Sequence, residues 1–203
     1  MIITKIEPQK NEERVNIYLD GEFAFGLMKE IQYKYSLTED MNIDREYIDK
    51  VLMAEEQSKA NNYALKFLAY RQRSKKEIID KLAEKGFEDK FIENTLVYLK
   101  SYDLVDDLEF AKSFAKDKIN LNKQGPQRIK YELYKKGISK EIIEKVLDED
   151  DNEYNRALEL AKKKLPSYKN DDRNAIYRKL GGFLQRRGYS YECVSKVLKE
   201  LIK

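Results

Sequence analysis

The sequence predicts a mainly α-helical protein made of tandem three-helix repeats, three units of about 50 residues, with a small N-terminal β-hairpin extension. Two observations predict the repeats: a glycine pattern that recurs at a fixed spacing, and apolar residues at helical period through most of the chain. A third observation predicts the hairpin, because apolar residues alternate on both sides of Asp20-Gly21.

The hairpin lies in the stretch ERVNIYLDGEFAFGL. A two-residue loop would place Leu19 opposite Glu22, whereas a three-residue loop brings the apolar residues of both strands to one face. Burial favours the three-residue loop, since a slip of one residue sends apolar side chains to the wrong side. The expected pairs are Leu19/Phe23, Ile17/Phe25 and Val15/Leu27. The segment MIITKI is a candidate third strand.

Helix-start signals follow the hairpin. Asp44 is a candidate N-cap, and Ile43 can pack against Ile48 as a hydrophobic staple. Further starts are indicated by two candidate capping boxes and by a proline at the first helical position. They are Ser74 with Glu77, Asp106 with Glu109, and Gly125-Pro126.

The repeat is defined by Gly86, Gly137 and Gly188, which lie 51 residues apart. Each glycine follows a cation and precedes an apolar residue, as expected where a helix ends in a left-handed residue. Four apolar columns recur at the same spacing: Ile78/Ile129/Leu180, Leu82/Leu133/Leu184, Ile92/Ile143/Val194 and Leu96/Leu147/Leu198. We expect four domains: a hairpin plus helix at 1–56, and three-helix repeats at 57–105, 106–150 and 151–203.

The formal net charge is only +3, but it is unevenly distributed. Residues 1–56 hold 7 Lys and Arg against 13 Asp and Glu, residues 57–150 hold 20 against 17, and residues 151–203 hold 13 against 7. An acidic head on a basic body suggests a polyanionic partner for the body. The alternative is that charged helix faces simply keep a small protein soluble.

Three segments contain no acid at all: residues 57–76, 118–131 and 173–191. Each covers the turn into the second helix of a repeat, so cations on stacked repeats would form a positive stripe. Such a stripe can neutralise phosphates or an acidic groove, and arginine can clamp either group at two points. The candidate binding residues are Arg71, Arg73, Lys75, Lys76, Lys123, Arg128, Lys130, Arg173, Arg178, Lys179, Arg186 and Arg187.

Tyrosines are interleaved with these cations and could stack on bases, although tyrosines at helical spacing also serve as core or boundary residues. They are Tyr70, Tyr131, Tyr134, Tyr177 and Tyr189. Many of the lysines could equally be a solvated helix face.

Catalytic chemistry finds little support. The chain has no histidine, which removes the commonest general base and zinc ligand, and it has no P-loop motif. The single cysteine, Cys193, is expected to be a buried apolar residue, and it allows no internal disulfide. No apolar run reaches membrane-spanning length. We therefore expect no enzyme, cofactor or metal, and a cytoplasmic protein.

Three stretches together resemble the RecX regulatory family of bacteria, of the clostridial and bacillar type. They are RQRSKKEIIDKLAEKGF, LKSYDLVDDLEFAKSFAKDK, and KQGPQRIKYELYKKGI with EIIEKVL. The most specific parts are Arg-x-Arg-Ser at 71–74, LVDDLEFA at 104–111 and GPQRIKYEL at 125–133. The likeness covers roughly residues 57–203, and the family pattern supports Arg71, Arg73 and Arg128 best.

This resemblance implies a non-enzymatic regulator of the RecA recombinase. It implies a protein that lodges in the helical groove of the RecA–single-stranded-DNA filament and inhibits its ATPase, strand-exchange and co-protease activities. Direct contact with single-stranded DNA and a monomeric state are further expectations. The alternatives are a stand-alone nucleic-acid-binding repeat protein without a RecA target and, with the least support from the residues, an enzyme.

Overall fold

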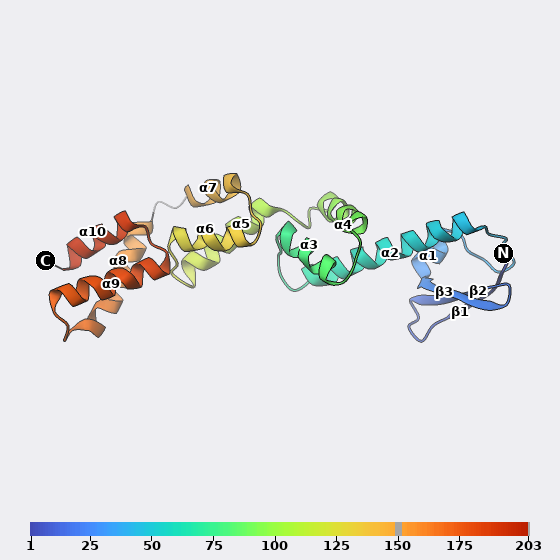
Figure 1. The fold of residues 1–203 in the computed structure, drawn as a ribbon, viewed down its shortest axis with the longest axis horizontal. Coiled ribbons are helices and arrows are strands. Elements are labelled where there is room, and N and C mark those ends of the chain that lie inside the picture. The colour runs from blue at the N-terminus through green and yellow to red at the C-terminus, as the bar shows by residue number, and fades with distance from the viewer. Residues whose placement is uncertain (149–151, 203) are drawn as a thin grey trace. The chain divides into compact units, whose positions relative to one another are not determined.

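The protein is described by a computed structural model, which places residues 1–148 and 152–202 (Figure 1). The chain divides into two compact units. The first contains residues 1–70 and 81–102, and the second contains residues 71–80 and 103–203. The expected domain boundary between residues 150 and 151 lies outside the described residues.

The first unit begins with a three-stranded antiparallel sheet in the order β1-β2-β3. The strands are β1 (Ile3–Pro8), β2 (Arg14–Leu19) and β3 (Glu22–Met28). The hairpin and the candidate third strand in MIITKI are therefore both confirmed. A third strand gives the bare hairpin a partner on its other edge, which a two-stranded ribbon needs for stability.

The turn between β2 and β3 differs from the prediction. It has two residues, Asp20 at φ 49° and Gly21 at φ 91°, and Leu19 pairs with Glu22. The expected Leu19/Phe23 pair is therefore wrong. Two successive positive φ values form the hairpin turn whose twist matches that of the strands, and this local preference decides the loop length.

The apolar face is nevertheless preserved further along the hairpin. The pairing shifts between Ile17 and Tyr18, so that Tyr18 faces Phe23 while Ile17 faces Phe25. A bulge on β3 absorbs one extra residue and returns the strands to the burial-favoured register. The predicted pairs Ile17/Phe25 and Val15/Leu27 are confirmed.

The sheet packs against two helices of the first unit, α1 (Lys29–Lys34) and α2 (Arg45–Leu68). The Asp44 side chain accepts a hydrogen bond from the Tyr47 amide at 2.8 Å, which confirms the predicted cap. Ile43 and Ile48 are both buried in this core. The other buried members are Ile3, Val15, Ile17, Leu27, Ile31, Leu37 and Val51.

A buried carboxylate joins the sheet to α2. The Glu55 side chain is 2% exposed, and its Oε1 lies 2.9 Å from the guanidinium of Arg14 on β2. Its Oε2 accepts a hydrogen bond from the Met28 amide at 2.8 Å. Both oxygens of this buried charge are therefore compensated by groups of the sheet, as burial of a carboxylate requires.

The last helix of the first unit, α4 (Asp89–Ser101), packs along α2. A polar cluster lies between them, in which the Gln57 side-chain amide donates to the Phe91 carbonyl at 3.2 Å and to the Thr95 hydroxyl at 3.0 Å. Thr95 in turn donates to the Asn61 side chain at 2.8 Å.

The second unit contains the first half of α3 (Lys75–Glu84) and all the helices from α5 onward. They are α5 (Asp107–Asn120), α6 (Pro126–Lys135), α7 (Lys140–Asp148), α8 (Glu153–Lys164), the short 3₁₀ helix η1 (Leu165–Tyr168), α9 (Arg173–Arg187) and α10 (Tyr191–Leu201). Gly125-Pro126 opens α6 as predicted. One buried core includes Phe110, Ile129, Leu133 and Ile143, and a second includes Leu180, Leu184, Val194 and Leu198.

Each of the three repeat glycines ends a helix in the left-handed conformation, at φ 85° for Gly86, 75° for Gly137 and 91° for Gly188. In all three turns the next residue donates its amide to a carbonyl five residues earlier, at 3.2 Å. The pairs are Phe87 with Leu82, Ile138 with Leu133, and Tyr189 with Leu184. The predicted C-caps and the predicted mainly helical repeat fold are confirmed.

The helix-start signals are largely confirmed. Ser74 and Glu77 form a complete capping box, with both reciprocal hydrogen bonds at 3.2 Å. Asp106 caps α5 through the amides of Leu108 and Glu109. Among the described residues Glu109 makes no return bond to Asp106 and instead pairs with Lys112 at 2.8 Å. None of the described helices is both long enough and apolar enough to span a membrane.

Replacing the N-cap residue of α2 tests how much this cap stabilises the first unit. Asp44→Ala should lower the free energy of unfolding by about 1 kcal/mol, because the Tyr47 amide loses its acceptor. The matched control is Asp49→Ala, which removes an exposed ion pair with Arg45 and should cost less than about 0.5 kcal/mol. Urea unfolding of both variants measures the difference, and equal losses would show that the cap is not the stabilising contact.

Candidate functional site

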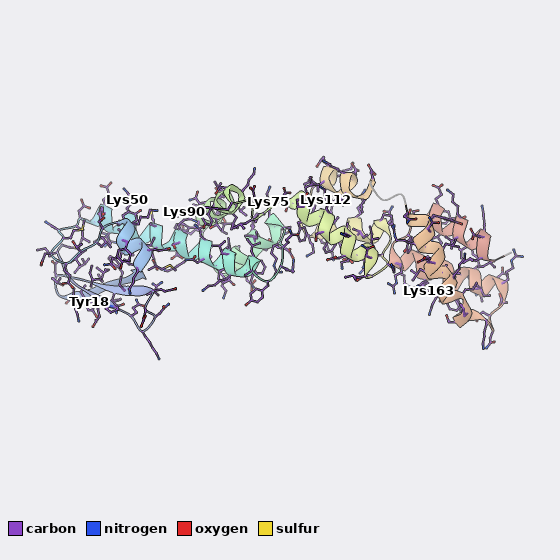
Figure 2. The ribbon with its side chains drawn as sticks, turned by 180° about the vertical axis from the view of Figure 1, so that it is seen from behind. Tyr18, Lys50, Lys75, Lys90, Lys112 and Lys163 are labelled. Atoms are coloured by element: carbon purple, nitrogen blue, oxygen red, sulfur yellow. The ribbon has the colours of Figure 1, made fainter. Side chains whose placement is uncertain are left out.

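All of the candidate cations predicted from the sequence belong to the second unit. They lie at or just before the start of α3, at or just before the start of α6, and along α9. Lys75, which opens α3, is labelled in Figure 2. Their contacts can therefore be compared within one body.

The turn at Lys136-Gly137 docks onto the first turn of α3. The hydroxyl of Ser74 donates to the Lys136 carbonyl at 2.7 Å, and the Lys136 ammonium lies 2.8 Å from Glu77. A Cβ on Gly137 would lie 2.6 Å from the Cβ of Lys76. We call this contact the first joint. Of the residues that close it, only Lys76 is among the cations predicted to bind a partner.

The turn at Arg187-Gly188 docks onto the start of α6 in the same way, and we call this contact the second joint. The Gly125 amide donates to the Arg187 carbonyl at 2.9 Å, and the Gln127 amide donates to the Gly188 carbonyl at 3.0 Å. A Cβ on Gly188 would overlap Arg128, and a Cβ on Gly125 would overlap the Gly188 carbonyl. Glycine is therefore required on both sides.

The two joints are the same contact repeated. Ser74 and Gly125 are 51 residues apart, as are Lys136 and Arg187. In each joint, the carbonyl of the cation before the turn glycine accepts a hydrogen bond from the residue that caps the helix of the preceding repeat. The 51-residue period of the sequence therefore corresponds to a repeated contact between repeats as well as to a repeated fold.

Side chains reinforce the second joint. The guanidinium of Arg187 donates to the Asn122 carbonyl at 2.7 Å. The Tyr189 hydroxyl donates to the Lys123 carbonyl at 3.0 Å, and its ring is buried. Tyr189 is therefore a packing residue, which excludes it as a base-stacking platform.

Glu77 is the anion at the centre of the first joint. Its oxygens receive the Arg71 guanidinium at 2.8 and 3.2 Å and the Lys136 ammonium at 2.8 Å. Burial alone would raise the pKa of this carboxyl. The hydrogen bonds from Arg71, Lys136 and the Ser74 amide outweigh it and lower the pKa from 4.5 to about 2.

Glu132 plays a comparable part on α6. It lies 2.7 Å from Lys118 and 2.9 Å from Arg128, and it accepts a hydrogen bond from Gln124. Burial opposes its ionisation, but the hydrogen bonds from Lys118 and Arg128 hold its pKa below the ordinary value. Arg71 and Arg128, the arginines that the family pattern favours, are thus both held by half-buried carboxylates.

Three further candidates are held by internal contacts. Lys76 pairs with Asp80 at 2.7 Å, and Lys179 pairs with Asp171 at 2.6 Å. Arg173 donates to the Ile202 carbonyl at 3.3 Å. Arg73 is half-buried, and its burial together with the nearby charge of Arg71 lowers the pKa of its guanidinium.

The remaining candidates are exposed and form no ion pair within residues 1–148 and 152–202. They are Lys75, Lys123, Lys130, Arg178 and Arg186. The candidate tyrosines of the second unit apart from Tyr189 are exposed as well: Tyr131, Tyr134 and Tyr177. Among the described residues, the five cations can meet a partner without losing an ion pair, whereas Tyr131 has the Lys135 ammonium 4.7 Å from its ring centroid.

The structure brings only some of the candidates together. The second joint places Arg187 and Gly188 against the start of α6, beside Arg128. Arg173 begins α9, a helix of 15 residues, so roughly 20 Å separates it from Arg187, and Lys179 lies in the middle of this helix. One continuous ridge for all the cations stays a prediction.

Sequence reasoning missed the two joints and the two carboxylates. A signal was present, because Glu77 and Glu132 are the first acids after the first two acid-free segments. Cys193 is buried, as predicted, and burial raises the pKa of its thiol to about 11.

Four family descriptions match the chain. They are the RecX N-terminal domain at residues 1–44 and the first, second and third RecX three-helix domains at residues 60–99, 106–147 and 150–198. The chain belongs to the RecX regulatory protein family.

Relatives from two clostridia share the RecX name over nearly the whole length. The regulatory protein RecX of Clostridioides difficile (strain 630) is 38% identical over 204 residues, covering 99% of this chain and 96% of the relative. The protein of the same name from Clostridium perfringens (strain 13 / Type A) is 38% identical, covering 98% and 95%.

Two solved structures are also similar. A crystal structure of regulatory protein RecX superposes with a TM-score of 0.79 at 31% identity, covering 98% of both chains. That of RecX from Lactobacillus salivarius superposes with a TM-score of 0.68 at 31% identity, covering 73% of this chain and 97% of the other.

The joints predict a graded response to one substitution made at three equivalent sites. Asparagine tolerates the left-handed conformation, so Gly86→Asn should cost only about 1 kcal/mol. Gly137→Asn and Gly188→Asn should cost at least about 2 kcal/mol more, because a Cβ there meets Lys76 or Arg128. Chemical unfolding measures all three, and equal losses would show that the joints do not constrain these turns.

The lowered pKa of Glu77 predicts how the free energy of unfolding changes at acid pH. Its folded-state pKa lies below the ordinary value, so its stabilisation is complete above about pH 4.5 and is lost as pH falls toward 2. The wild type should lose free energy of unfolding as pH falls from about 4.5 toward 2. In Glu77→Gln this loss should be smaller by roughly 1–2 kcal/mol, a figure that already allows for solvent screening.

The matched control is Glu93→Gln, an exposed α4 residue without an ion pair among the described residues. Unfolding measured at several pH values between 2 and 7 makes the comparison. A pH profile of Glu77→Gln that runs parallel to the wild type would contradict the assignment.

Proposed function

We propose that this chain is a non-enzymatic regulator that binds the RecA–single-stranded-DNA filament in its helical groove and inhibits the recombinase. The inhibited activities are ATP hydrolysis, strand exchange and co-protease stimulation. Membership of the RecX regulatory family is the observation that carries this proposal. The protein acts in the cytoplasm as a monomer.

The geometry of the second unit supports a filament as the target. The first and second joints repeat one contact at a spacing of 51 residues, so successive repeats of the unit dock in the same way. A filament groove also repeats its acidic and phosphate groups. Several weak contacts on one body gain affinity because the first contact raises the effective concentration of the rest.

The exposed cations are the proposed contact residues, with Lys130, Arg178 and Arg186 as the foremost. They carry charge that no carboxylate of the described chain neutralises at contact distance, so a phosphate or acidic side chain meets no internal competitor. Arg71 and Arg128, by contrast, would have to leave Glu77 and Glu132 to bind fully. We propose that these two arginines mainly position the joints.

The second candidate function is that of a stand-alone nucleic-acid-binding protein. The exposed Tyr131, Tyr134 and Tyr177, each next to a cation in the sequence, favour it. Aromatic rings can stack on the bases of a single strand while neighbouring cations contact its phosphates. Fluorescence anisotropy over a salt range separates the two functions. Preference for a RecA-coated strand supports the regulator, whereas a steep salt slope with no such preference supports the stand-alone binder.

The exposed cations can be tested by charge reversal. Arg178→Glu with Arg186→Glu should weaken inhibition of RecA ATP hydrolysis on single-stranded DNA by about tenfold or more, since two attractive charges become repulsive. The readout is the concentration of the chain that halves the ATPase rate.

The matched control makes the same change in net charge elsewhere on the second unit. Lys196→Glu with Lys199→Glu alters α10, outside the acid-free segments, and should leave inhibition within about twofold of the wild type. Equal effects of the two pairs would show that only net charge matters. Wild-type protein that leaves ATP hydrolysis unchanged would overturn the proposed function itself.

A further inference from the structure

The turn formed by residues 82–87 is the first member of the series of three, and among the described residues of its own unit no helix start docks onto it. We infer that this turn is a docking surface for the N-terminal turn of a helix in the protein partner. The inference rests on the proposed function, in which that partner is a subunit of the recombinase filament.

The turn has the same backbone as its two equivalents. Gly86 is at φ 85°, between the 75° of Gly137 and the 91° of Gly188. The Phe87 amide donates to the Leu82 carbonyl at the 3.2 Å seen in both other turns. A surface of this shape therefore accepts a helix start twice within this one chain.

The residues of this turn that are equivalent to those of the joints, Lys85 and Gly86, are exposed. The carbonyls of Lys136 and Arg187 each accept a hydrogen bond from the residue that caps a helix of the preceding repeat. The equivalent carbonyl of Lys85 receives no hydrogen bond among the described residues of its own unit. Among the described residues of its own unit, no atom outside the turn lies within 4 Å of a Cβ built on Gly86, whereas a Cβ on Gly137 or Gly188 would overlap Lys76 or Arg128.

Neither of the two helix starts that the joints use is vacant to dock onto this turn. Ser74 and Gly125 are already occupied in the two joints. The equivalent position in the third repeat is Ile176, which lies inside α9 because that helix begins earlier, at Arg173. A second copy of the chain would therefore present no free equivalent of Ser74 or Gly125, and the fitting occupant is a helix of another protein.

The two occupied joints define the chemistry of that helix. Its cap is small, as Ser74 and Gly125 are, and in the second joint a Cβ on the cap would overlap the Gly188 carbonyl. An acid in its first turn would meet the Lys85 ammonium as Glu77 meets Lys136 at 2.8 Å. That ammonium now lies over the Tyr63 ring, 5.5 Å from its centroid, a weak exposed contact that an acid can replace.

The test is to fill the turn without straining it. Gly86→Asn keeps the left-handed conformation but places a side chain where the partner helix would dock. Gly21→Asn is the matched control, because Gly21 has a similar φ of 91° and equally open surroundings in the hairpin turn. Thermal unfolding confirms that both variants remain folded at the temperature of the binding assay.

Binding to a RecA-coated single strand is measured by anisotropy for the wild type and both variants, with Lys85→Ala as a third. We expect Gly86→Asn to weaken binding at least about tenfold, Lys85→Ala by a few-fold, and Gly21→Asn hardly at all. If the wild type binds and a folded Gly86→Asn variant binds equally well, the docking surface is overturned and the proposed function stands. Absence of wild-type binding overturns both.

Discussion

The second unit depends on one contact, in which a left-handed glycine turn docks onto the first turn of a helix in the preceding repeat. The first turn of a helix has amides without intrahelical partners, and a helix end has carbonyls in the same condition. In the second joint the Gly125 amide donates to the Arg187 carbonyl, and in the first joint the Ser74 hydroxyl takes the place of the amide and donates to the Lys136 carbonyl. Glycine permits both the backbone conformation and the close approach.

This arrangement explains why the cations divide into two groups. Arg71 and Lys136 contact the half-buried Glu77, and Arg128 contacts the half-buried Glu132, so that they offset the rise in carboxyl pKa that burial causes. Lys130, Arg178 and Arg186 stay exposed. Charge at the start of a repeat helix thus serves the fold at some positions and remains available to a partner at others.

Much of the fold could be predicted from the sequence, because each prediction rests on local physics. The turn glycines, the Asp44 cap, the Ser74–Glu77 capping box and the apolar columns are all properties of a few neighbouring residues. The predicted three-residue hairpin loop is wrong, because the local preference of Asp20-Gly21 for two positive φ values sets the turn, whereas burial sets the register only further along the strands. The structure satisfies both requirements with a two-residue turn and a bulge.

The candidate site could be predicted only in part. The acid-free segments identify where cations gather, but not which of them meets a carboxylate from a distant position, such as Lys136 with Glu77. The spacing of 51 residues shows that the turns are equivalent, yet it gives no sign of what each turn touches. Contacts between repeats depend on packing that no single segment encodes.

Hydrogen exchange at the start of α6 tests the central contact most directly. The amides of Gly125 and Gln127 donate across the second joint, whereas those of Asp89 and Lys90 at the start of α4 have no acceptor among the described residues. The joint predicts that Gly125 and Gln127 exchange slowly, at the rate of the interior of α6. Exchange as fast as that of Asp89 and Lys90 would show that the turn does not stay docked.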